Sequence, residues 1–513
     1  MRIEDFDLEL HPIPGAVPAW RGEADATQWR VLCQHVRDRG GRLLALWGSD
    51  ARVTRGGFAV HAGLITRSGL VWLTHPVAAE SYPGIADIFP PAERMQRALA
   101  DLLGVHANDQ PQARPWLRHG AWPAGEFPLR KDFDARAKRG NVPDAYPFVR
   151  VEGDGVHEIP VGPVHAGTIE PGHFRFSILG ERVLRLEERL GYTHKGIEKR
   201  FEQMTLADGY RLAGRISGDS TVAYAWAYAM AAESAAAMTP PPRALWLRAL
   251  LLERERVANH LGDLGFLGND AGFAFGLVQF SRLKEDLLRT NLELFGHRYL
   301  MDCIIPGGVA RDLGEMGAAQ IGAECDALDR ALAGLHQIYD NHAGLQDRLM
   351  ATGIVTPELA HRLGLCGLAG RASGQASDAR VQFPPAPYGE LEVNMATQRN
   401  GDVAARVQVR FDEVTESLRL SRLLLAKMPQ GPISAELPDT ADGALGVGWV
   451  EGWRGEVLIA LETNPGNEIR RLHAHDPSWQ NWPVLEHAVI GNIVPDFPLI
   501  NKSFNLSYSG HDL

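Results

Sequence analysis

The chain has 513 residues, enough for two to four domains, and its 45% hydrophobic and 22% charged residues are typical of a folded globular protein. The net charge of −11 comes from 63 acidic against 52 basic residues spread along the chain, which argues against a nucleic-acid-binding protein. The four cysteines stand far apart without a C-x-x-C pair, so a disulfide framework or a thiolate metal site is not expected. No apolar run is long enough to span a bilayer.

Residues 1–135 are predicted to form a small α/β domain. Thr27–Arg39 has a helical pattern, and a second helix is expected at Arg94–Leu103, ended by Gly104. Three short apolar runs with Gly-containing breaks between them suit a small sheet: Leu43–Trp47, Phe58–Ile65 and Leu70–Thr74. The charged and Pro-containing residues 136–150 that follow indicate a linker.

Residues 151–513 are predicted to form a bundle of long helices flanked by small antiparallel sheets, so the fold class of the chain is α+β. A hairpin pattern joins Phe174–Leu179 to Arg182–Leu186. Long helices are expected from an Ala-rich composition or from apolar residues at three- and four-residue steps: Val222–Met238, Arg243–Leu264, Phe275–Leu300, Met316–Leu349 and Phe411–Lys427. Strands return at the end: Gly446–Val450, Glu456–Glu462 and Glu468–His475.

The stretch Gly214–Thr221, directly before the Ala-rich helix, is the first candidate site. Ser217, Asp219 and Ser220 are residue types that cap free N–H groups at the start of a helix. The small side chains of the helix let neighbouring backbones approach, so we expect it to be buried on most sides. Taken alone, such a stretch is more often a capped core helix than a functional site.

Together with the C-terminal residues, this stretch resembles the two ligand motifs of nickel–iron hydrogenase large subunits of the formate-hydrogenlyase and hydrogenase-4 type. In that family an Arg-x-Cys-x-x-Cys turn enters a helix, and an Asp-Pro-Cys-x-x-Cys segment closes the module. The same frames here are RISGDS, starting at Arg215, and NLSYSG, starting at Asn505. The positions that carry cysteine in the family are Ser217, Ser220, Ser507 and Gly510.

The resemblance extends over nearly the whole chain. Residues 1–135 resemble the small hydrophilic subunit of respiratory complex I, through Tyr82–Glu93 and Pro128–Asp132. Residues 151–513 resemble the complex I quinone-site subunit, a relative of the hydrogenase large subunit. The matching segments of this second part stand in the family order: Gly162–His165, His194–Glu198, Asn259–Leu261, Asp270–Gly272, Pro306–Ala310, Arg371–Gly374, Asp378–Arg380 and Glu451–Glu456.

Departures from the family pattern bear on the function. Nickel and iron in the family are held by four soft thiolates, which serine hydroxyls and a glycine do not replace, so we expect no nickel site. The tyrosine that contacts quinone in complex I relatives falls on Gly218. Of the two family histidines near residue 165, only His165 aligns simply, while His173 has a different spacing.

The resemblance implies a remodelled cavity with no metal ligand and no cofactor bound directly. Six polar residues are candidates for its catalytic groups: Asp219, His165, Asp270, Arg215, His194 and Glu198. We expect Asp219 to handle protons, because the helix N-terminus and the nearby Arg215 favour its ionised form while burial opposes it. Each residue also has a structural interpretation, with Asp219 as a helix cap, Arg215 as the partner of a carboxylate and His194 as a structural histidine.

Three functions stay open. The leading one is an electron-transfer subunit in the peripheral arm of a membrane-bound, complex-I-like oxidoreductase on the cytoplasmic face of the membrane. There an iron–sulfur small subunit would pass electrons to a quinone or another small acceptor, with coupling to integral membrane ion-translocating subunits. The second is a catalytically silent scaffold that joins these parts. The third is a redox site with a different metal held by oxygen and nitrogen.

Overall fold

The computed structural model describes residues 8–108, 110, 114–140, 145–165 and 169–513, so residues 141–144 of the expected linker lie outside the described part. The first region is built on a five-stranded sheet with the order β1-β2-β5-β4-β3, antiparallel except for the parallel pair β2 and β5. Its strands are β1 (His11–Ile13), β2 (Ala19–Glu23), β3 (Arg42–Ala51), β4 (Gly57–Thr66) and β5 (Gly69–Val77). The smaller elements around it are α2 (Arg52–Arg55), β6 (Ser81–Pro83) and β7 (His106–Asn108).

Two helices of this region follow the sequence prediction. α1 (Ala26–Asp38) begins at a capping box, in which the Asp25 carboxylate accepts from the first turn and Gln28 bonds back to the Asp25 backbone. α3 (Ala92–Leu103) packs on β3 and ends at Gly104, whose φ of 70° is the left-handed conformation that glycine adopts without strain.

The second region opens with a three-stranded antiparallel sheet of β8 (Val156–Val161), β9 (His173–Leu179) and β10 (Arg182–Arg189), which contains the predicted hairpin. Its centre is α6 (Thr221–Ala235) packed on a second antiparallel sheet. The strands of that sheet are β13 (Leu445–Glu451), β14 (Glu456–Asn464) and β15 (Glu468–His475). α6 is buried from Thr221 to Ser234. Gly446 and Gly448 of β13 make this contact possible, because a Cβ at either position would clash with a carbonyl oxygen of α6.

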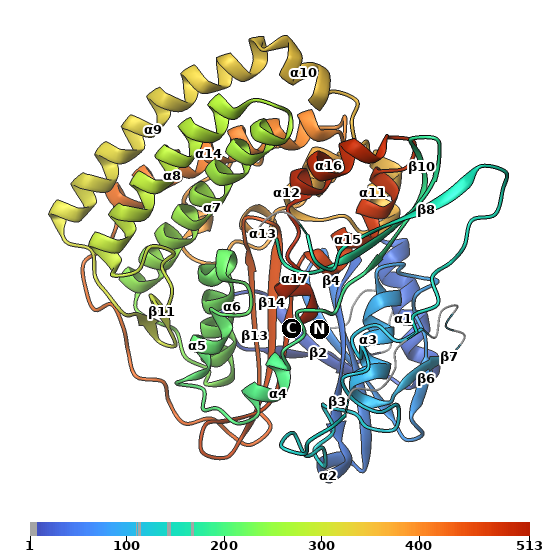
Figure 1. Ribbon diagram of the computed structural model, residues 1–513. Coiled ribbons are helices and arrows are strands. Elements are labelled where there is room, and N and C mark those ends of the chain that lie inside the picture. The colour runs from blue at the N-terminus through green and yellow to red at the C-terminus, as the bar shows by residue number, and fades with distance from the viewer. Residues whose placement is uncertain (1–7, 109, 111–113, 141–144, 166–168) are drawn as a thin grey trace.

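Long helices form the other side of this region and run side by side in Figure 1: α7 (Pro242–Asp270), α8 (Ala274–Phe295), α9 (Glu315–Asn341) and α14 (Val403–Lys427). The bounds of the predicted helices differ in several places: α6 ends at Ala235 rather than Met238, α7 continues to Asp270, and α14 begins at Val403 rather than Phe411. α8 stops at Phe295 because Gly296 turns left-handed, and the segment Met316–Leu349 divides into α9 and α10 (Ala343–Leu349) at His342. The His342 ring accepts the Leu345 N–H and so starts a new helix. On α9, Ile338 is 39% exposed, whereas its neighbour Tyr339 is buried.

Shorter elements connect these parts: α4 (Ile197–Phe201), α5 (Gly209–Ala213), η1 (Gly218–Ser220), β11 (Ile304–Ile305), β12 (Gly308–Val309), α11 (Pro357–Leu363), α12 (Gly367–Ala372), α13 (Ala379–Gln382), η2 (Tyr388–Glu390), α15 (Ser478–Ala488), η3 (Val494–Asp496), α16 (Phe497–Phe504) and α17 (Tyr508–Asp512). The predicted α+β class is confirmed. None of the helices in the described part of the chain is both long and apolar enough to cross a membrane.

The two regions share one continuous hydrophobic core. At their junction Trp47 of β3 stacks on His473 of β15, with ring centroids 4.9 Å apart and planes 5° apart. The Arg471 guanidinium donates to the Gly48 carbonyl at 2.9 Å, and the Gln480 amide donates to the Leu44 carbonyl. The first region is therefore fixed against the sheet that supports α6.

Candidate functional site

The two serine-containing motif segments, 290 residues apart in the chain, meet in the structure. Ser217 lies just before η1, and Ser507 is the residue at which α17 begins. Their hydroxyl oxygens are 2.8 Å apart, and both side chains are buried. The Ser507 Oγ also accepts the Gly510 N–H at 2.8 Å, while the Ser220 hydroxyl accepts from Arg454 at 3.2 Å. Three of the four motif positions, Ser217, Ser507 and Gly510, are thus in direct contact, and Arg454 links Ser220 to Asp219 beside them.

A carboxylate occupies the space beside Gly510. Asp476, directly after β15, accepts the Tyr224 hydroxyl at 2.7 Å and the Ser478 N–H at 2.8 Å. A Cβ built on Gly510 would collide with Asp476 Oδ2. A side chain at position 510 would therefore require Asp476 to move. Its two hydrogen bonds hold the Asp476 carboxylate in place and oppose this movement.

Asp219 forms an ion pair with Arg454, which stands in the turn between β13 and β14. The two carboxylate oxygens accept from the guanidinium at 2.8 and 2.5 Å, and the Ser217 hydroxyl donates to the carboxylate at 2.9 Å. Burial raises the pKa of Asp219, but the charge of Arg454 and these hydrogen bonds outweigh it and lower that pKa to about 2. The Asp219 side chain is 38% exposed while Arg454 is 5% exposed, so a buried cation faces a carboxylate that solvent reaches.

The prediction that Arg215 supplies the guanidinium next to Asp219 was wrong. Arg215 points away and pairs with Asp302, with two nitrogen–oxygen distances of 2.7 and 2.8 Å. The two side chains of this pair are 45% and 36% exposed, which agrees with a structural role for Arg215 as the partner of a carboxylate. Arg215 and Asp219 are only four residues apart, but the turn into η1 sends their side chains to different partners.

The group that caps the N-terminus of α6 also differs from the predicted one. Ser220 stands at the N-cap position and makes no side-chain cap hydrogen bond. Instead Glu255 of α7 accepts the N–H groups of Val222 and Ala223, at 2.6 and 3.2 Å. Burial raises the pKa of Glu255 to about 8, although these N–H groups act in the opposite direction. The first turn of α6 is therefore held by a neighbouring helix.

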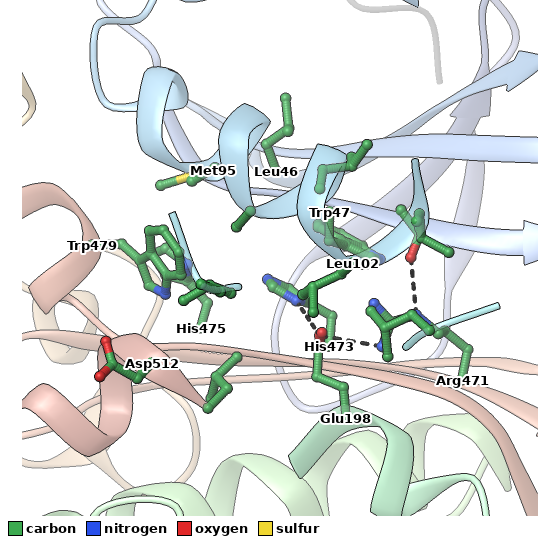
Figure 2. Close-up of a pocket in the computed structure, with 17 residues that line it drawn as sticks. Leu46, Trp47, Met95, Leu102, Glu198, Arg471, His473, His475, Trp479 and Asp512 are labelled. Carbon is green, nitrogen blue, oxygen red and sulfur yellow. Dashed lines mark hydrogen bonds and ion pairs between the residues drawn. The ribbon is translucent and has the colours of Figure 1, made fainter. Parts of the chain in front are cut away.

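His194 and Glu198 lie on the other side of the C-terminal segment. The His194 ring bonds to the Asp512 carbonyl at 2.8 Å, and burial lowers its pKa. Glu198 of α4 pairs with His473 at 2.7 Å and Arg471 at 3.2 Å, beside a small cavity of about 40 Å³ at the junction of the two regions (Figure 2). Burial raises the pKa of Glu198, but the charge of Arg471 and the His473 hydrogen bond lower it to about 2. Glu198 therefore holds Arg471 and His473, the two β15 residues that contact β3 of the first region.

His165 and Asp270 also have local partners. The His165 ring bonds to the Gly172 carbonyl at 2.9 Å and lies 6.0 Å from the Phe174 ring. Asp270 is exposed at the last turn of α7. Among the residues that the structure describes, no hydrogen bond or ion pair joins either of them to Asp219. His173, the other histidine considered, bonds to the Gly162 carbonyl at 3.0 Å.

Arg454, Asp476 and Glu255 are the parts of the site that sequence reasoning missed. Arg454 lies in a segment that matches the family, but nothing local indicates a contact with a residue 235 positions away. The described part of the chain contains no group of three or more His, Cys, Asp or Glu placed to hold a metal ion. The four cysteines are buried and free.

A small α/β region joined to a helical bundle, with two motif segments meeting at the start of a central helix, defines a fused subunit of the respiratory-complex class. Family models confirm this. Residues 23–139 match the respiratory-chain NADH dehydrogenase 30 Kd subunit, and residues 270–444 match the 49 Kd subunit of the same enzyme.

Similar proteins extend the match. Formate hydrogenlyase subunit 5 of Escherichia coli (strain K12) is 31% identical over 92% of this chain and 85% of its own length, and hydrogenase-4 component G of that organism is 31% identical over 92% and 84%. The C/D subunit of NADH-quinone oxidoreductase from Phocaeicola vulgatus is 27% identical over 78% and 80%. The chain belongs to this family of fused 30 Kd and 49 Kd respiratory subunits. A chain of the membrane-bound sulfane sulfur reductase, an archaeal respiratory membrane complex, has a TM-score of 0.66 and 26% identity over 70% of this chain and 99% of that one.

Proposed function

We propose that this chain is a peripheral-arm electron-transfer subunit of a membrane-bound, complex-I-like oxidoreductase that works without nickel. The observation that carries the proposal is the contact between Ser217 and Ser507. The two motif segments keep the arrangement that would place four ligands around one point, while hydroxyl groups and a glycine stand at those positions. An electron-transfer subunit with a different acceptor needs the scaffold of the two motif segments, but it does not need the thiolates.

The absence of nickel is part of the proposal. Nickel and iron favour soft thiolate donors, and serine hydroxyls stay protonated at neutral pH. The Ser217 and Ser507 hydroxyls bond to each other and to their neighbours, and Asp476 fills the space beside Gly510. These residues do not fit a nickel–iron group, so no step of the reaction is assigned to one.

We place the electron acceptor, a quinone or another small molecule, beside the solvent-reached face of Asp219. Electrons would come from an iron–sulfur small subunit docked next to the motif segments, and integral membrane subunits would use the released energy to move ions. Reduction of a quinone to a quinol takes up two electrons and two protons. Asp219, paired with Arg454, would hold a fixed negative charge there, and a proton would reach the acceptor through it only transiently.

A silent scaffold is the second candidate, and the Asp219–Arg454 ion pair favours it. A carboxylate held ionised by a buried guanidinium is a weak proton carrier at neutral pH, and it joins η1 firmly to the β13–β14 turn. In this function the chain would only connect the iron–sulfur and membrane parts.

The test is purification of the tagged chain from its native membranes, followed by metal analysis and acceptor reduction. We expect a cluster-bearing small subunit and membrane proteins to copurify, with no stoichiometric nickel. One nickel per chain, or a chain that purifies alone, would contradict the proposal. Asp219→Asn separates the two candidates when acceptor reduction is measured per assembled complex. The electron-transfer function predicts loss of most of the activity, whereas the scaffold predicts no change; Asp302→Asn is the control.

A further inference from the structure

Eight ionisable side chains form a closed cluster in the interior between α7, α12, α13, α14 and β13, which we term the buried charge cluster. Each of its side chains is at most 3% exposed. Its members are Glu253, Arg256, His260, Arg371, Asp378, Arg380, Glu413 and Glu451.

Ion pairs connect the whole cluster. Arg371 donates to Glu413 at 2.7 and 2.9 Å and to Glu451 at 2.7 Å. Glu413 also accepts from the His260 ring at 2.8 Å. A second set of bonds continues from Glu253, which pairs with Arg256 at 3.3 Å and with Arg380 at 3.2 Å, and Arg380 in turn bonds Asp378 at 2.7 Å. Arg256 closes the cluster at 3.8 Å from Glu413.

The charges of the cluster do not balance. It contains four carboxyl groups and three guanidinium groups, so with every carboxyl ionised and His260 neutral it would carry one excess negative charge. An unpaired charge in a water-free interior costs several kcal/mol, and a buried group takes up a proton rather than carry it. The neighbouring pair Arg42–Glu456 is balanced, and the positive charges of Arg410 and Lys502 are directed at Asp263 rather than at the cluster's carboxyl groups.

We propose that the buried charge cluster is a proton-binding site that holds one exchangeable proton at neutral pH, on Glu451. Contacts within the described part of the chain single out this carboxyl. Glu413 and Asp378 each receive two hydrogen bonds from a guanidinium, and Glu253 pairs with two arginines and accepts from Tyr388 and Ser417. Glu451 receives one guanidinium hydrogen bond, from Arg371, and one backbone bond, from Ala379 at 3.1 Å.

The electrostatic environment of Glu451 also favours a proton on this carboxyl group. Burial and the negative charge of Asp378 raise the pKa of Glu451 to about 7. Burial acts the same way on Glu413, but Arg371 and His260 outweigh it and hold the pKa of Glu413 well below its usual range. Burial lowers the pKa of His260, so this ring stays neutral, and its Nδ1 has no hydrogen-bond partner among the described residues. The charged and titratable groups that face Glu451 from the surrounding elements are Arg371, Asp378, Glu456, Arg256, Arg42 and Cys366.

The proton lies directly behind the candidate site. Trp453 and Arg454, two and three residues after Glu451, bond to the Asp219 carbonyl and carboxylate. From α7, Asn259 donates to the same Asp219 carbonyl, next to His260 of the cluster. A change of charge on Glu451 therefore acts on the turn that carries Arg454. The inference goes beyond the proposed function and does not depend on it, because the proton is bound with or without electron transfer.

The test compares Glu451→Gln with the wild-type full-length chain by infrared spectroscopy near neutral pH. An amide is a neutral analogue of a protonated carboxyl, so we expect Glu451→Gln to fold and to lose the carbonyl band of one protonated carboxyl group. The difference between the melting temperature of Glu451→Gln and that of the wild type should increase by on the order of 2 °C as the pH increases from about 5 to about 8. The sign follows because a raised carboxyl pKa stabilises the wild type at low pH and loses that stabilisation on deprotonation.

The matched control is Glu233→Gln. Glu233 is also buried but stands in a balanced pair with Arg248 at 2.6 Å, so its replacement should remove no protonated-carboxyl band and should lower the melting temperature. An unchanged carboxyl band in Glu451→Gln would overturn the proposal. So would a Glu451→Gln chain that fails to fold at neutral pH, because that failure would mean that the carboxyl is ionised in the native protein.

Discussion

At the scale of single residues, Asp219 illustrates how a distant partner sets the chemistry of a carboxylate. The sequence indicates two opposing influences on its charge, burial and neighbouring positive groups. In the structure the second prevails, since Arg454 reaches the carboxylate with two hydrogen bonds and lowers its pKa to about 2. Asp219 is thus ionised at neutral pH, which makes it a fixed charge first and a proton carrier only under strong local change.

Asp219→Asn should destabilise the chain, because it leaves the buried Arg454 guanidinium without a countercharge. We expect a loss of about 1–3 kcal/mol in the free energy of unfolding, reduced by the exposure of Asp219. The difference should shrink as the pH falls from about 4 towards 2, where the wild-type carboxylate becomes protonated. Denaturant unfolding across this range measures both effects. Asp302→Asn, in the exposed pair with Arg215, should cost about 0.5 kcal/mol or less, and equal costs for both variants would contradict the ion-pair interpretation.

Gly510→Ala should destabilise the chain by about 1–3 kcal/mol, because the added methyl group collides with Asp476. The same substitution at Gly322 in α9, where a Cβ meets open space, should be neutral or stabilising, since alanine favours helices. If Asp476 is the obstacle, Asp476→Ala should relieve the clash, and the double variant should be at least about 0.5 kcal/mol more stable than the sum of the single effects. Additive losses in this cycle would mean that the Ser507 hydroxyl, 2.9 Å from the added Cβ, is the main obstacle instead of Asp476.

At the scale of elements, α6 shows how a helix can depend on a neighbour for its start. Its own Ser220 makes no cap hydrogen bond, and Glu255 of α7 accepts the N–H groups of Val222 and Ala223 in its first turn. The motif loop and the helical bundle are therefore connected by a carboxyl group as well as by apolar packing.

Glu255→Ala should expose the start of α6 by leaving the Val222 and Ala223 N–H groups buried without an acceptor. We expect a loss of about 1–3 kcal/mol and faster hydrogen exchange at these two amides. Glu255→Gln retains one acceptor oxygen and should keep most of the protection. Unchanged exchange in the alanine variant would show that another group caps the helix.

Much of this architecture could be predicted from the sequence, for reasons that particular elements make clear. The hairpin β9–β10 and the helices α7 and α14 follow local patterns of period two or of three to four, and Gly104 ends α3 as expected. The break at His342 has no such signal, because it depends on one ring accepting one N–H. The pairs Asp219–Arg454 and Glu255 with α6 depend on tertiary contacts that no local pattern encodes.

At the scale of the whole molecule, the two regions form one body with a shared core. The junction combines the stacking of Trp47 on His473 with the hydrogen bond from Arg471 to the Gly48 carbonyl, and Glu198 holds Arg471 from within the second region. The five-stranded sheet of the first region therefore supports β15. Through β15 it also supports the segment that carries Asp476 and the C-terminal motif.

Trp47→Ala should weaken this junction more than it disturbs either region. We expect the free energy of unfolding to fall by about 3–5 kcal/mol. We also expect the single calorimetric transition to separate into two, with the first region unfolding at the lower temperature. Val53→Ala, at a position that is 90% exposed, should leave the transition within about 0.5 kcal/mol of the wild type. One transition at the wild-type temperature in Trp47→Ala would mean that the regions are coupled elsewhere.

The contact between Gly510 and Asp476 limits which residues these two positions can hold. A cysteine placed at position 510 would strike a carboxylate held by Tyr224 and Ser478, so this single substitution is disfavoured. Removing Asp476 first would leave the Tyr224 hydroxyl buried without its acceptor, so that order of changes is also unfavourable. Both single-step routes pass through a less stable protein. A thiolate at position 510 would therefore need two coordinated substitutions, one at Gly510 and one at Asp476.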